Sequence, residues 1–258
     1  MKTDGASIQS SLPLIEEIAK KCQEFKLDGQ QKDANEFLSA CLSECNILSS
    51  LTKGEIITTF KCECNLYSDN KDNEERFKNI INLAIIGDSV QEIVNTAMND
   101  KNYLKRCSWC QKMTKHDTSQ KWAILPAVLI ITLQRFEHSK FKKVMPSITL
   151  LIDGVSYILR AILTHHGKYS HRGHYTTKLC MDNGNLWIKC NDMMVSQDKD
   201  VPLEGYIFIY DKIVSNIPFE KSDYTDKNLT TQGKRCHSTS SEDSLKVALF
   251  QIYGVVNA

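Results

Sequence analysis

Residues 127–133 read Ala-Val-Leu-Ile-Ile-Thr-Leu, and this run does most to decide the fold. It is continuous, apolar and rich in β-branched residues, and it follows Pro126, which is the pattern of a short strand covered on both faces. We expect it to lie centrally in the core. Other segments of β type follow along the chain, with turn signals between them at 153–154 and 182–184: Val144–Leu151, Ser156–Thr164, His174–Cys180, Leu186–Cys190 and Gly205–Tyr210.

The segments before this strand begin as helices. Apolar residues recur at helical spacing from Ser11 to Leu51, with a break expected at Asp28-Gly29, and the β-branched residues of Glu55–Cys62 then predict a strand. Next we expect a polar loop over 68–76, an extended segment over 77–86 and a short helix over 90–99 that begins after Ser89. Helices first and strands later predict an α+β protein rather than alternating βαβ units.

Composition narrows the class of protein. The 258 residues are 41% apolar and 24% charged, which is enough to bury a sizeable core. The formal net charge is only +1, so we expect neither nucleic acid nor a membrane surface as a partner. The chain has no membrane-length apolar run and no signal-peptide pattern at residues 1–5, so we expect an intracellular protein, cytoplasmic and/or nuclear. Its 10 cysteines are then core thiols, metal ligands or a nucleophile.

One candidate site combines Gly173-His174-Tyr175 with Asn191 and Asp192. A histidine that acts as base for a thiol needs an amide or carboxylate acceptor at its far ring nitrogen. If His174 opens one strand and Asn191 ends the next, the hairpin through 182–184 brings both side chains to the same end. Taken alone, the pattern also fits a structural or surface histidine, which is the commoner case.

A second candidate site combines Cys62 and Cys64 with Cys107 and Cys110. Two cysteine pairs from separate segments are the usual ligand set of a structural zinc. The second pair has knuckle spacing, whereas the first has one intervening residue instead of two, although alternate residues of a strand still share a face. Buried free thiols are the alternative.

A third segment, Gln30-Gln31-Lys32-Asp33-Ala34-Asn35-Glu36-Phe37-Leu38, has polar residues that could cap a helix or bind a ligand. On local grounds it is also an ordinary start of an amphipathic helix.

Taken in order, these segments resemble the ubiquitin-specific proteases (USPs), a papain-like deubiquitinating family built from fingers, palm and thumb. Within the third segment, Gln31-Lys32-Asp33-Ala34-Asn35-Glu36-Phe37-Leu38 resembles the family's Gln-x-Asp-Ala-x-Glu-Phe-Leu box. Cys107-x-x-Cys110 resembles a fingers knuckle, and Leu125–Phe136 resembles a palm strand. Four further segments resemble the family's histidine box and last strands: His165-x-Gly167, Gly173-His174-Tyr175, Trp187 with Asn191-Asp192-x-x-Val195, and Gly205–Tyr210.

The resemblance implies a fold and a domain plan. The fold would be α+β and papain-like, with a helical N-terminal part and an antiparallel β-sheet palm and fingers. Residues 1–212 would form a partial USP catalytic domain, with thumb helices over 11–51, fingers and palm strands over 55–136, and the palm with the histidine box over 144–212. Residues 213–258 would form a polar tail, partly disordered.

The resemblance also implies a reaction, isopeptide cleavage after the C-terminal glycine of ubiquitin, with ubiquitin and ubiquitinated proteins as partners. His174 would be the general base, Asn191 the orienting residue and Asp192 a helper. Substrate binding would involve Gly173, which leaves room for the substrate tail, and Tyr175, Gln31 and Asp33. Cys62, Cys64, Cys107 and Cys110 would hold a structural zinc, and no catalytic cofactor is expected.

Two departures from the family pattern matter. The Gly-Asn-Thr-Cys box that supplies the family's thiolate is absent, and the only cysteine ahead of Gln31 is Cys22, which no glycine-rich turn precedes. We therefore expect the chain alone to be inactive and to need a missing N-terminal segment. A non-catalytic ubiquitin-binding scaffold is the alternative. The second departure is Lys61 at the position of the family's first zinc ligand, which implies lost zinc or binding through Cys62.

Overall fold

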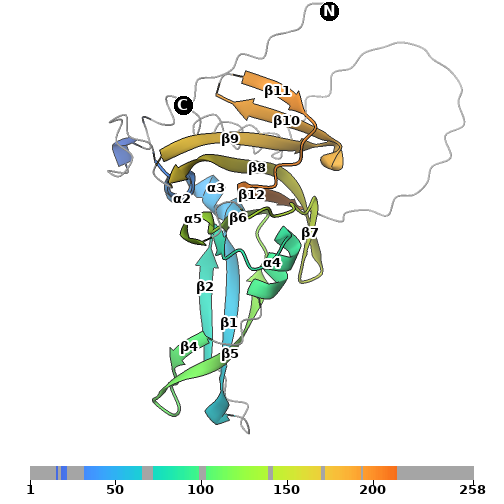
Figure 1. Ribbon diagram of the computed structural model, residues 1–258. Coiled ribbons are helices and arrows are strands. Elements are labelled where there is room, and N and C mark those ends of the chain that lie inside the picture. The colour runs from blue at the N-terminus through green and yellow to red at the C-terminus, as the bar shows by residue number, and fades with distance from the viewer. Residues whose placement is uncertain are drawn as a thin grey trace, which may run out of the picture.

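The computed structural model describes residues 16, 19–21, 32–65, 72–98, 103–138, 142–169, 172–192 and 194–213. Gln31, Cys22, the expected break at 28–29 and the tail beyond residue 213 lie outside these residues. Two sheets dominate the molecule. A curved sheet lies in the upper part of Figure 1, and a long, narrow sheet projects downward from it as an arm. No helix among the described residues is both long and apolar enough to cross a membrane.

The large sheet has eight strands. Its hydrogen-bonded order is β11-β10-β9-β8-β12-β6-β3, and β7 pairs with β8 off this path. The bounds are β3 Ile81–Leu83, β6 Val128–Leu133, β7 Thr149–Ile152, β8 Val155–Tyr169, β9 Arg172–Met181, β10 Leu186–Asn191, β11 Met194–Asp198 and β12 Gly205–Lys212. The expected antiparallel palm sheet is confirmed: all of its pairs are antiparallel except β3 with β6, which is a parallel pair at the edge.

The expected core strand is confirmed. All six residues of β6 are buried, and the strand is hydrogen-bonded to β12 on one side and to β3 on the other. Its alternate residues enter two different cores: Leu129, Ile131 and Leu133 face one, whereas Val128 and Ile130 face the other. This two-sided burial is why the run shows no alternation of polar and apolar residues.

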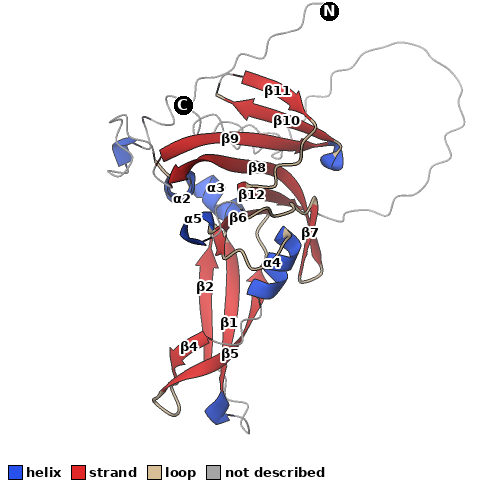
Figure 2. Ribbon diagram, viewed as in Figure 1, coloured by secondary structure: helices blue, strands red, loops and turns tan. Residues whose placement is uncertain are grey.

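Helices lie on both sides of this sheet (Figure 2). Helices α2 (Ala34–Glu44) and α3 (Asn46–Thr52) contribute to the core that contains Val128 and Ile130. Helix α4 (Val90–Ala97) contributes to the other core and begins after Ser89, whose side chain accepts a hydrogen bond from the Glu92 amide, as expected. The short helix α5 (Arg135–His138) follows β6.

The arm is a four-stranded antiparallel sheet in the order β2-β1-β5-β4. Its strands are β1 (Gly54–Cys62), β2 (Asp72–Lys78), β4 (Tyr103–Arg106) and β5 (Met113–Ile124). The strand expected over 55–62 is confirmed as β1. The loop expected over 68–76 is wrong from residue 72 onward, because the polar segment 72–78 pairs with β1 along its whole length. The strand expected over 144–151 is wrong over 144–148, since β7 begins at Thr149.

Candidate functional site

His174 and Asn191 come together at one end of the β9–β10 hairpin, as the sequence predicts. The two strands pair antiparallel from Leu186 opposite Met181 to Cys190 opposite Thr177, and the turn between them spans Asp182–Gly184. The Nε2 atom of His174 lies 2.5 Å from Oδ1 of Asn191. Both groups stand on paired strands, so the hairpin itself fixes their relative position.

This contact assigns the tautomer of the His174 ring. An amide oxygen can only accept a hydrogen bond, so Nε2–H is the donor to Asn191 Oδ1. In the neutral ring the proton then resides on Nε2, and Nδ1 keeps its lone pair. His174 is more than a third exposed, and in this tautomer Nδ1 is the ring nitrogen that can accept a proton.

Asp192 is close to His174 but is not its hydrogen-bond partner. The shortest distance between His174 Nε2 and a carboxylate oxygen of Asp192 is 4.0 Å. Asp192 has a positive φ of 50°, in the tight turn that joins β10 to β11. Asn191 rather than Asp192 is therefore the hydrogen-bond partner of His174 Nε2.

A second histidine, His166, lies beside His174 on β8, and the sequence does not single it out. The two residues are directly opposite in the β8–β9 register, and their ring centroids are 6.4 Å apart. Burial, followed by the charge of His174, lowers the pKa of His166. Its Nε2 atom lies 2.8 Å from the hydroxyl of Thr176, which holds the ring in place.

Asp33 lies between helix α2 and the large sheet. Its Oδ1 accepts hydrogen bonds from the backbone N–H groups of Asn35 at 2.8 Å and Glu36 at 3.2 Å, which caps α2. The Tyr206 hydroxyl donates to the same carboxylate at 3.0 Å, and the Tyr175 hydroxyl donates at 3.3 Å. A carboxylate offers about four positions at which it can accept a hydrogen bond, so groups of the chain itself fill the acceptor positions of Asp33.

These contacts bear on three expected substrate-binding residues. Asp33 and Tyr175 are brought together, but both are engaged in hydrogen bonds within the chain itself. Burial, followed by the charge of Asp33, raises the pKa of Tyr175 and of Tyr206. At Gly173 an added Cβ would collide with the His165 ring, so packing alone requires glycine there. Room for a substrate tail at Gly173 stays a prediction.

Tyr206 is a residue of this network that the sequence analysis does not identify. Its signal is a hydroxyl-bearing residue inside β12, whose first six residues are all buried. A buried tyrosine hydroxyl usually has a hydrogen-bond partner, and here the partner is supplied by a residue 173 positions earlier.

No cysteine in the described part of the chain is hydrogen-bonded to His174. Cys41 is buried in α2, and Cys180 and Cys190 lie on β9 and β10. Burial raises the pKa of Cys180 and of Cys190, which disfavours their thiolates.

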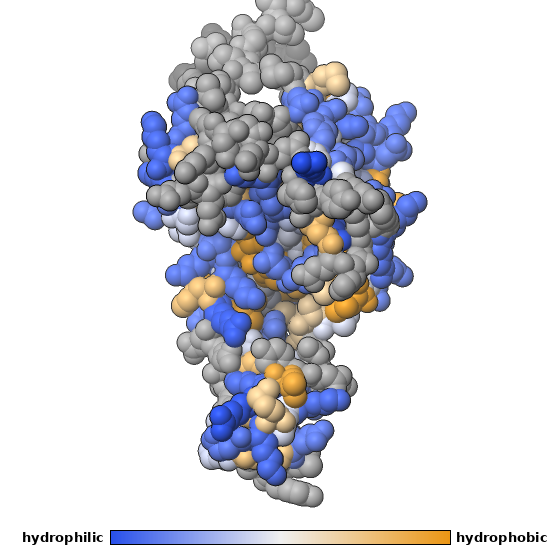
Figure 3. Space-filling view, turned by 60° about the vertical axis from the view of Figure 1, so that its left-hand side comes forward, coloured by the Kyte–Doolittle hydropathy of each residue, from blue (hydrophilic) through white to orange (hydrophobic). Residues whose placement is uncertain are grey.

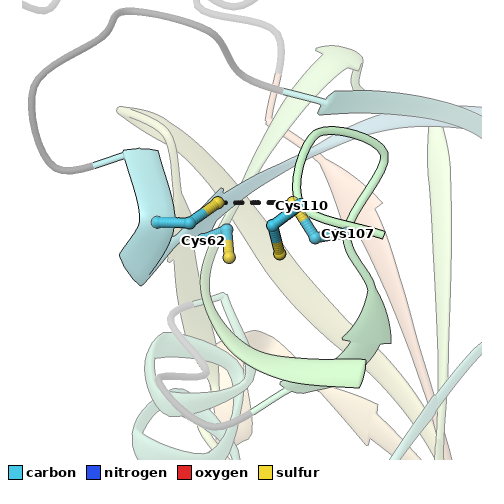
Figure 4. Close-up of side chains that lie close together, drawn as sticks. Cys62, Cys107 and Cys110 are labelled. Atoms are coloured by element: carbon cyan, nitrogen blue, oxygen red, sulfur yellow. Dashed lines mark hydrogen bonds between the residues drawn. The ribbon is translucent and has the colours of Figure 1, made fainter. Parts of the chain in front are cut away.

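The four predicted zinc ligands gather at the end of the arm. The Sγ atoms of Cys62, Cys64, Cys107 and Cys110 all lie within 4.8 Å of one another. Figure 4 shows the side chains of Cys62, Cys107 and Cys110 converging, and Cys64 Sγ lies 3.6 Å from Cys107 Sγ. A tetrahedron with Zn–S bonds of about 2.3 Å has S···S edges of roughly 3.8 Å. The four thiols therefore fit a closed structural zinc.

The short spacing of the first pair is accommodated by a turn. β1 ends at Cys62, and a 3₁₀ turn over Glu63–Asn65 follows directly. Cys62 would therefore be the ligand from the strand and Cys64 the ligand from the turn, while Lys61 is exposed and lies opposite Asp117. Zinc binding through Cys62 is thus the outcome that the geometry supports.

The pKa values within the cluster shift in opposite directions. Burial raises the pKa of Cys62, but hydrogen bonds from Thr114 and the Cys64 backbone outweigh it, and the pKa falls to about 7. The hydrogen bond with Cys62, followed by burial, raises the pKa of Cys64 to about 12. The cluster therefore stabilises one thiolate and disfavours a second. A bound cation would offset the repulsion between the thiolates.

Comparisons with known proteins agree with this architecture. A family model described as ubiquitin carboxyl-terminal hydrolase matches residues 5–210. Ubiquitin carboxyl-terminal hydrolase 42 of Homo sapiens is 27% identical over 218 residues, which are 71% of this chain and 16% of that protein. Ubiquitin carboxyl-terminal hydrolase 25 of Arabidopsis thaliana is 25% identical over 211 residues, which are 67% of this chain and 32% of that protein. The chain thus spans less than a third of the length of either relative.

Solved structures show the same fold. The SAGA DUB module Ubp8/Sgf11/Sus1/Sgf73 bound to monoubiquitin matches with a TM-score of 0.66 at 19% identity, over 80% of this chain and 53% of that chain. The same module bound to ubiquitin aldehyde matches with a TM-score of 0.62 at 18% identity, over 80% of this chain and 54% of that chain.

Proposed function

Because the chain belongs to the ubiquitin carboxyl-terminal hydrolase family and has the fold of a ubiquitin-specific protease domain, we propose that it supplies the base-bearing half of a thiol-dependent deubiquitinase. In this proposal His174 is the general base, Asn191 orients it, and Asp192 adds negative charge nearby. The observation that carries the proposal is the contact between His174 Nε2 and Asn191 Oδ1 at 2.5 Å.

The proposed reaction follows from the tautomer. Nδ1 of His174 takes the proton of a cysteine thiol, and the thiolate attacks the carbonyl carbon of the isopeptide bond after the last glycine of ubiquitin. The imidazolium then donates its Nδ1 proton to the leaving lysine amine, and water hydrolyses the thioester. Throughout, Asn191 Oδ1 accepts the hydrogen bond from His174 Nε2–H and holds the orientation of the ring.

We propose that the thiol comes from outside these 258 residues. The sequence contains no Gly-Asn-Thr-Cys box, and the thiols of Cys180 and Cys190 have pKa values raised by burial. A covalent mechanism that lacks its nucleophile loses nearly all of its rate, so the chain alone is proposed to be inactive.

Ubiquitin is the proposed partner. The matched SAGA modules are bound to ubiquitin or ubiquitin aldehyde, and each match covers 80% of this chain. Zinc is proposed to have a structural role in the arm, where Cys62, Cys64, Cys107 and Cys110 would hold it. When bound, it would fix the end of the arm and take no part in the chemistry.

Titration with labelled ubiquitin tests the binding part of the proposal. We expect saturable binding in the micromolar range, weakened at least fivefold when ubiquitin lacks its last two glycines, because the tail would lie beside His174. Truncating the ligand leaves the fold of this chain untouched. Absence of saturable binding at high micromolar concentration would overturn the proposal.

An electrophilic ubiquitin probe tests the nucleophile separately. We expect no covalent adduct with the chain alone, even where binding is saturable. An adduct on any of the 10 cysteines would show that the chain carries its own nucleophile, and peptide mapping would locate it.

A further inference from the structure

The outer face of the β4–β5 hairpin has a composition that neither the zinc cluster nor the His174 site explains. In the register of this hairpin Leu104 lies opposite Lys115, and Arg106 lies opposite Met113. Residues directly opposite in an antiparallel pair project to the same face. We call this block, with two residues of the adjoining turn, the fingertip surface: Leu104, Arg106, Trp109, Lys112, Met113 and Lys115.

The residues between them project to the other face. Lys105 and Thr114 are opposite each other and only partly exposed, and the Lys105 ammonium lies 4.0 Å from the centre of the Phe60 ring. The inner face of the hairpin is therefore packed against the arm, while the outer face meets solvent.

The fingertip surface exposes large apolar side chains. Leu104 is 62% exposed, Trp109 58% and Met113 61%. In the space-filling view, apolar and charged residues are interspersed at the lower end of the molecule, where the arm ends (Figure 3). Apolar side chains clustered on a surface and bordered by charges are typical of protein–protein contacts.

Trp109 is held in a rigid turn. The Gln111 N–H donates to the Cys107 carbonyl at 3.0 Å, and the Cys107 N–H donates to the Lys112 carbonyl at 2.9 Å. The Trp109 N–H donates to Cys107 Sγ at 3.4 Å. A large aromatic side chain on a fixed backbone loses little entropy when it binds, which is the property of an anchor residue.

The charge of the hairpin indicates the kind of partner. Residues 103–116 contain Lys105, Arg106, Lys112 and Lys115 and no aspartate or glutamate, although the whole chain has a net charge of only +1. Three of these cations belong to the fingertip surface, interspersed with the apolar side chains. The complementary ligand therefore alternates carboxylates with apolar side chains.

We propose that the fingertip surface docks an acidic segment of a partner protein whose carboxylates are interspersed with apolar side chains. A nucleic acid suits this surface less well, because only Trp109 can stack on a base, and the aliphatic Leu104 and Met113 would gain nothing. The fingertip surface lies at the opposite end of the molecule from the β10–β11 hairpin beside His174 (Figure 1). The proposal goes beyond the proposed function, since it concerns a partner held away from the site of cleavage.

Fluorescence polarisation with a synthetic peptide tests this proposal. The probe is a labelled 12-residue peptide that alternates Glu or Asp with Leu or Phe, and the protein is the zinc-loaded full chain. We expect saturable binding with a Kd on the order of 10–100 μM, because the surface is smaller than a standard interface. Raising the salt concentration from 50 to 300 mM should weaken binding several-fold.

Matched variants locate the binding. Trp109→Ala removes the anchor but keeps the backbone N–H that contacts Cys107, and Lys115→Glu reverses one charge. Each should weaken peptide binding about tenfold, with zinc content and melting temperature unchanged. Ile47→Ala, at an apolar residue 73% exposed on α3, and Lys121→Glu, at an exposed residue further along β5, should leave binding unchanged.

Three outcomes would overturn the proposal. The first is no saturable peptide binding below 1 mM, and the second is equal loss in the control variants. The third is tighter binding of a single-stranded oligonucleotide than of the peptide at the same salt concentration, which would make this a nucleic-acid surface. Ubiquitin titrations of Trp109→Ala keep the two proposals apart, because we expect ubiquitin affinity within twofold of the parent chain.

Discussion

Replacement of Asp33 by alanine is the most informative single change to the fold. The carboxylate caps α2 through the N–H groups of Asn35 and Glu36, and it accepts hydrogen bonds from Tyr206 and Tyr175. Loss of a helix cap costs about 1 kcal/mol. The Tyr206 hydroxyl, on a residue 5% exposed, would lose its acceptor at a cost of about 1–2 kcal/mol.

Tyr175 should contribute less to the effect. Its hydrogen bond to Asp33 is longer, at 3.3 Å, and its hydroxyl also accepts the Ala34 N–H at 3.3 Å. We assign it about 0.5 kcal/mol. The sum predicts that Asp33→Ala lowers the free energy of unfolding by about 3 kcal/mol, which is roughly a 1 M decrease in the urea midpoint at a slope of about 3 kcal/mol/M.

Urea denaturation followed by far-UV circular dichroism measures this directly. Tyr206→Phe alone should cost about 1 kcal/mol, and the double variant should cost about 1 kcal/mol less than the sum of the two single variants, because both remove the same contact. Asp200→Ala, at an exposed aspartate, is the matched control and should change stability by less than about 0.5 kcal/mol. A cost below 1 kcal/mol for Asp33→Ala, or full additivity with Tyr206→Phe, would refute the reasoning.

Four further outcomes are expected. Asn191→Ala removes the acceptor of His174 Nε2–H, so ¹H–¹⁵N NMR of the ring should show a mixture of tautomers where the parent shows one, and an unchanged Nε2–H population would contradict the assignment. Cys110→Ser should reduce zinc content measured by colorimetric release, together with the melting temperature, and equal metal content in both proteins would argue against this ligand set. Arg135→Met should cost about 3 kcal/mol in urea denaturation, because the buried guanidinium donates to three backbone carbonyls, and a cost within 0.5 kcal/mol would be inconsistent with that role. Burial, followed by the charge of His174, lowers the pKa of His166, so on acidification the unfolded chain takes up a proton before the folded chain does. The contribution of His166 to the free energy of unfolding is therefore fully present above about pH 6.5 and is lost as the pH falls through the folded pKa. His166→Gln should flatten this decline.

The buried strands and the local turns could be predicted from the sequence. β6 is apolar at almost every position because both of its faces are covered, and Asp153-Gly154 adopts the two positive φ angles, 47° and 79°, of a tight hairpin turn. The hairpin that joins His174 to Asn191 has a turn signal of the same kind. These features depend on neighbours close in sequence, so the sequence contains enough information to find them.

The arm was harder to predict because its strands are polar. β5 buries alternate residues, but two of these are His116 and Thr118, so its hydrophobic alternation is too weak to mark where the strand begins and ends. The polar β2 is likewise a strand because β1 pairs with it, not because of its own pattern. The contacts of Asp33 with residues more than 140 positions away are also invisible locally, and only the assembled fold shows that its carboxylate is occupied.

The two parts of the candidate site therefore depend on different contacts. His174 and Asn191 are 17 residues apart in one hairpin, so their contact needs only β9, β10 and the turn between them. Asp33 ties the helical part to β9 and β12 through long-range hydrogen bonds, beside the apolar contacts of α2 and α3 with the sheet. Asp33→Ala is then expected to lower stability and leave the His174 tautomer as it is, whereas Asn191→Ala should alter the tautomer with little loss of stability. Since the contact that sets the His174 tautomer lies within one palm hairpin, the thiol proposed above would meet an imidazole whose tautomer does not depend on how the helices are attached.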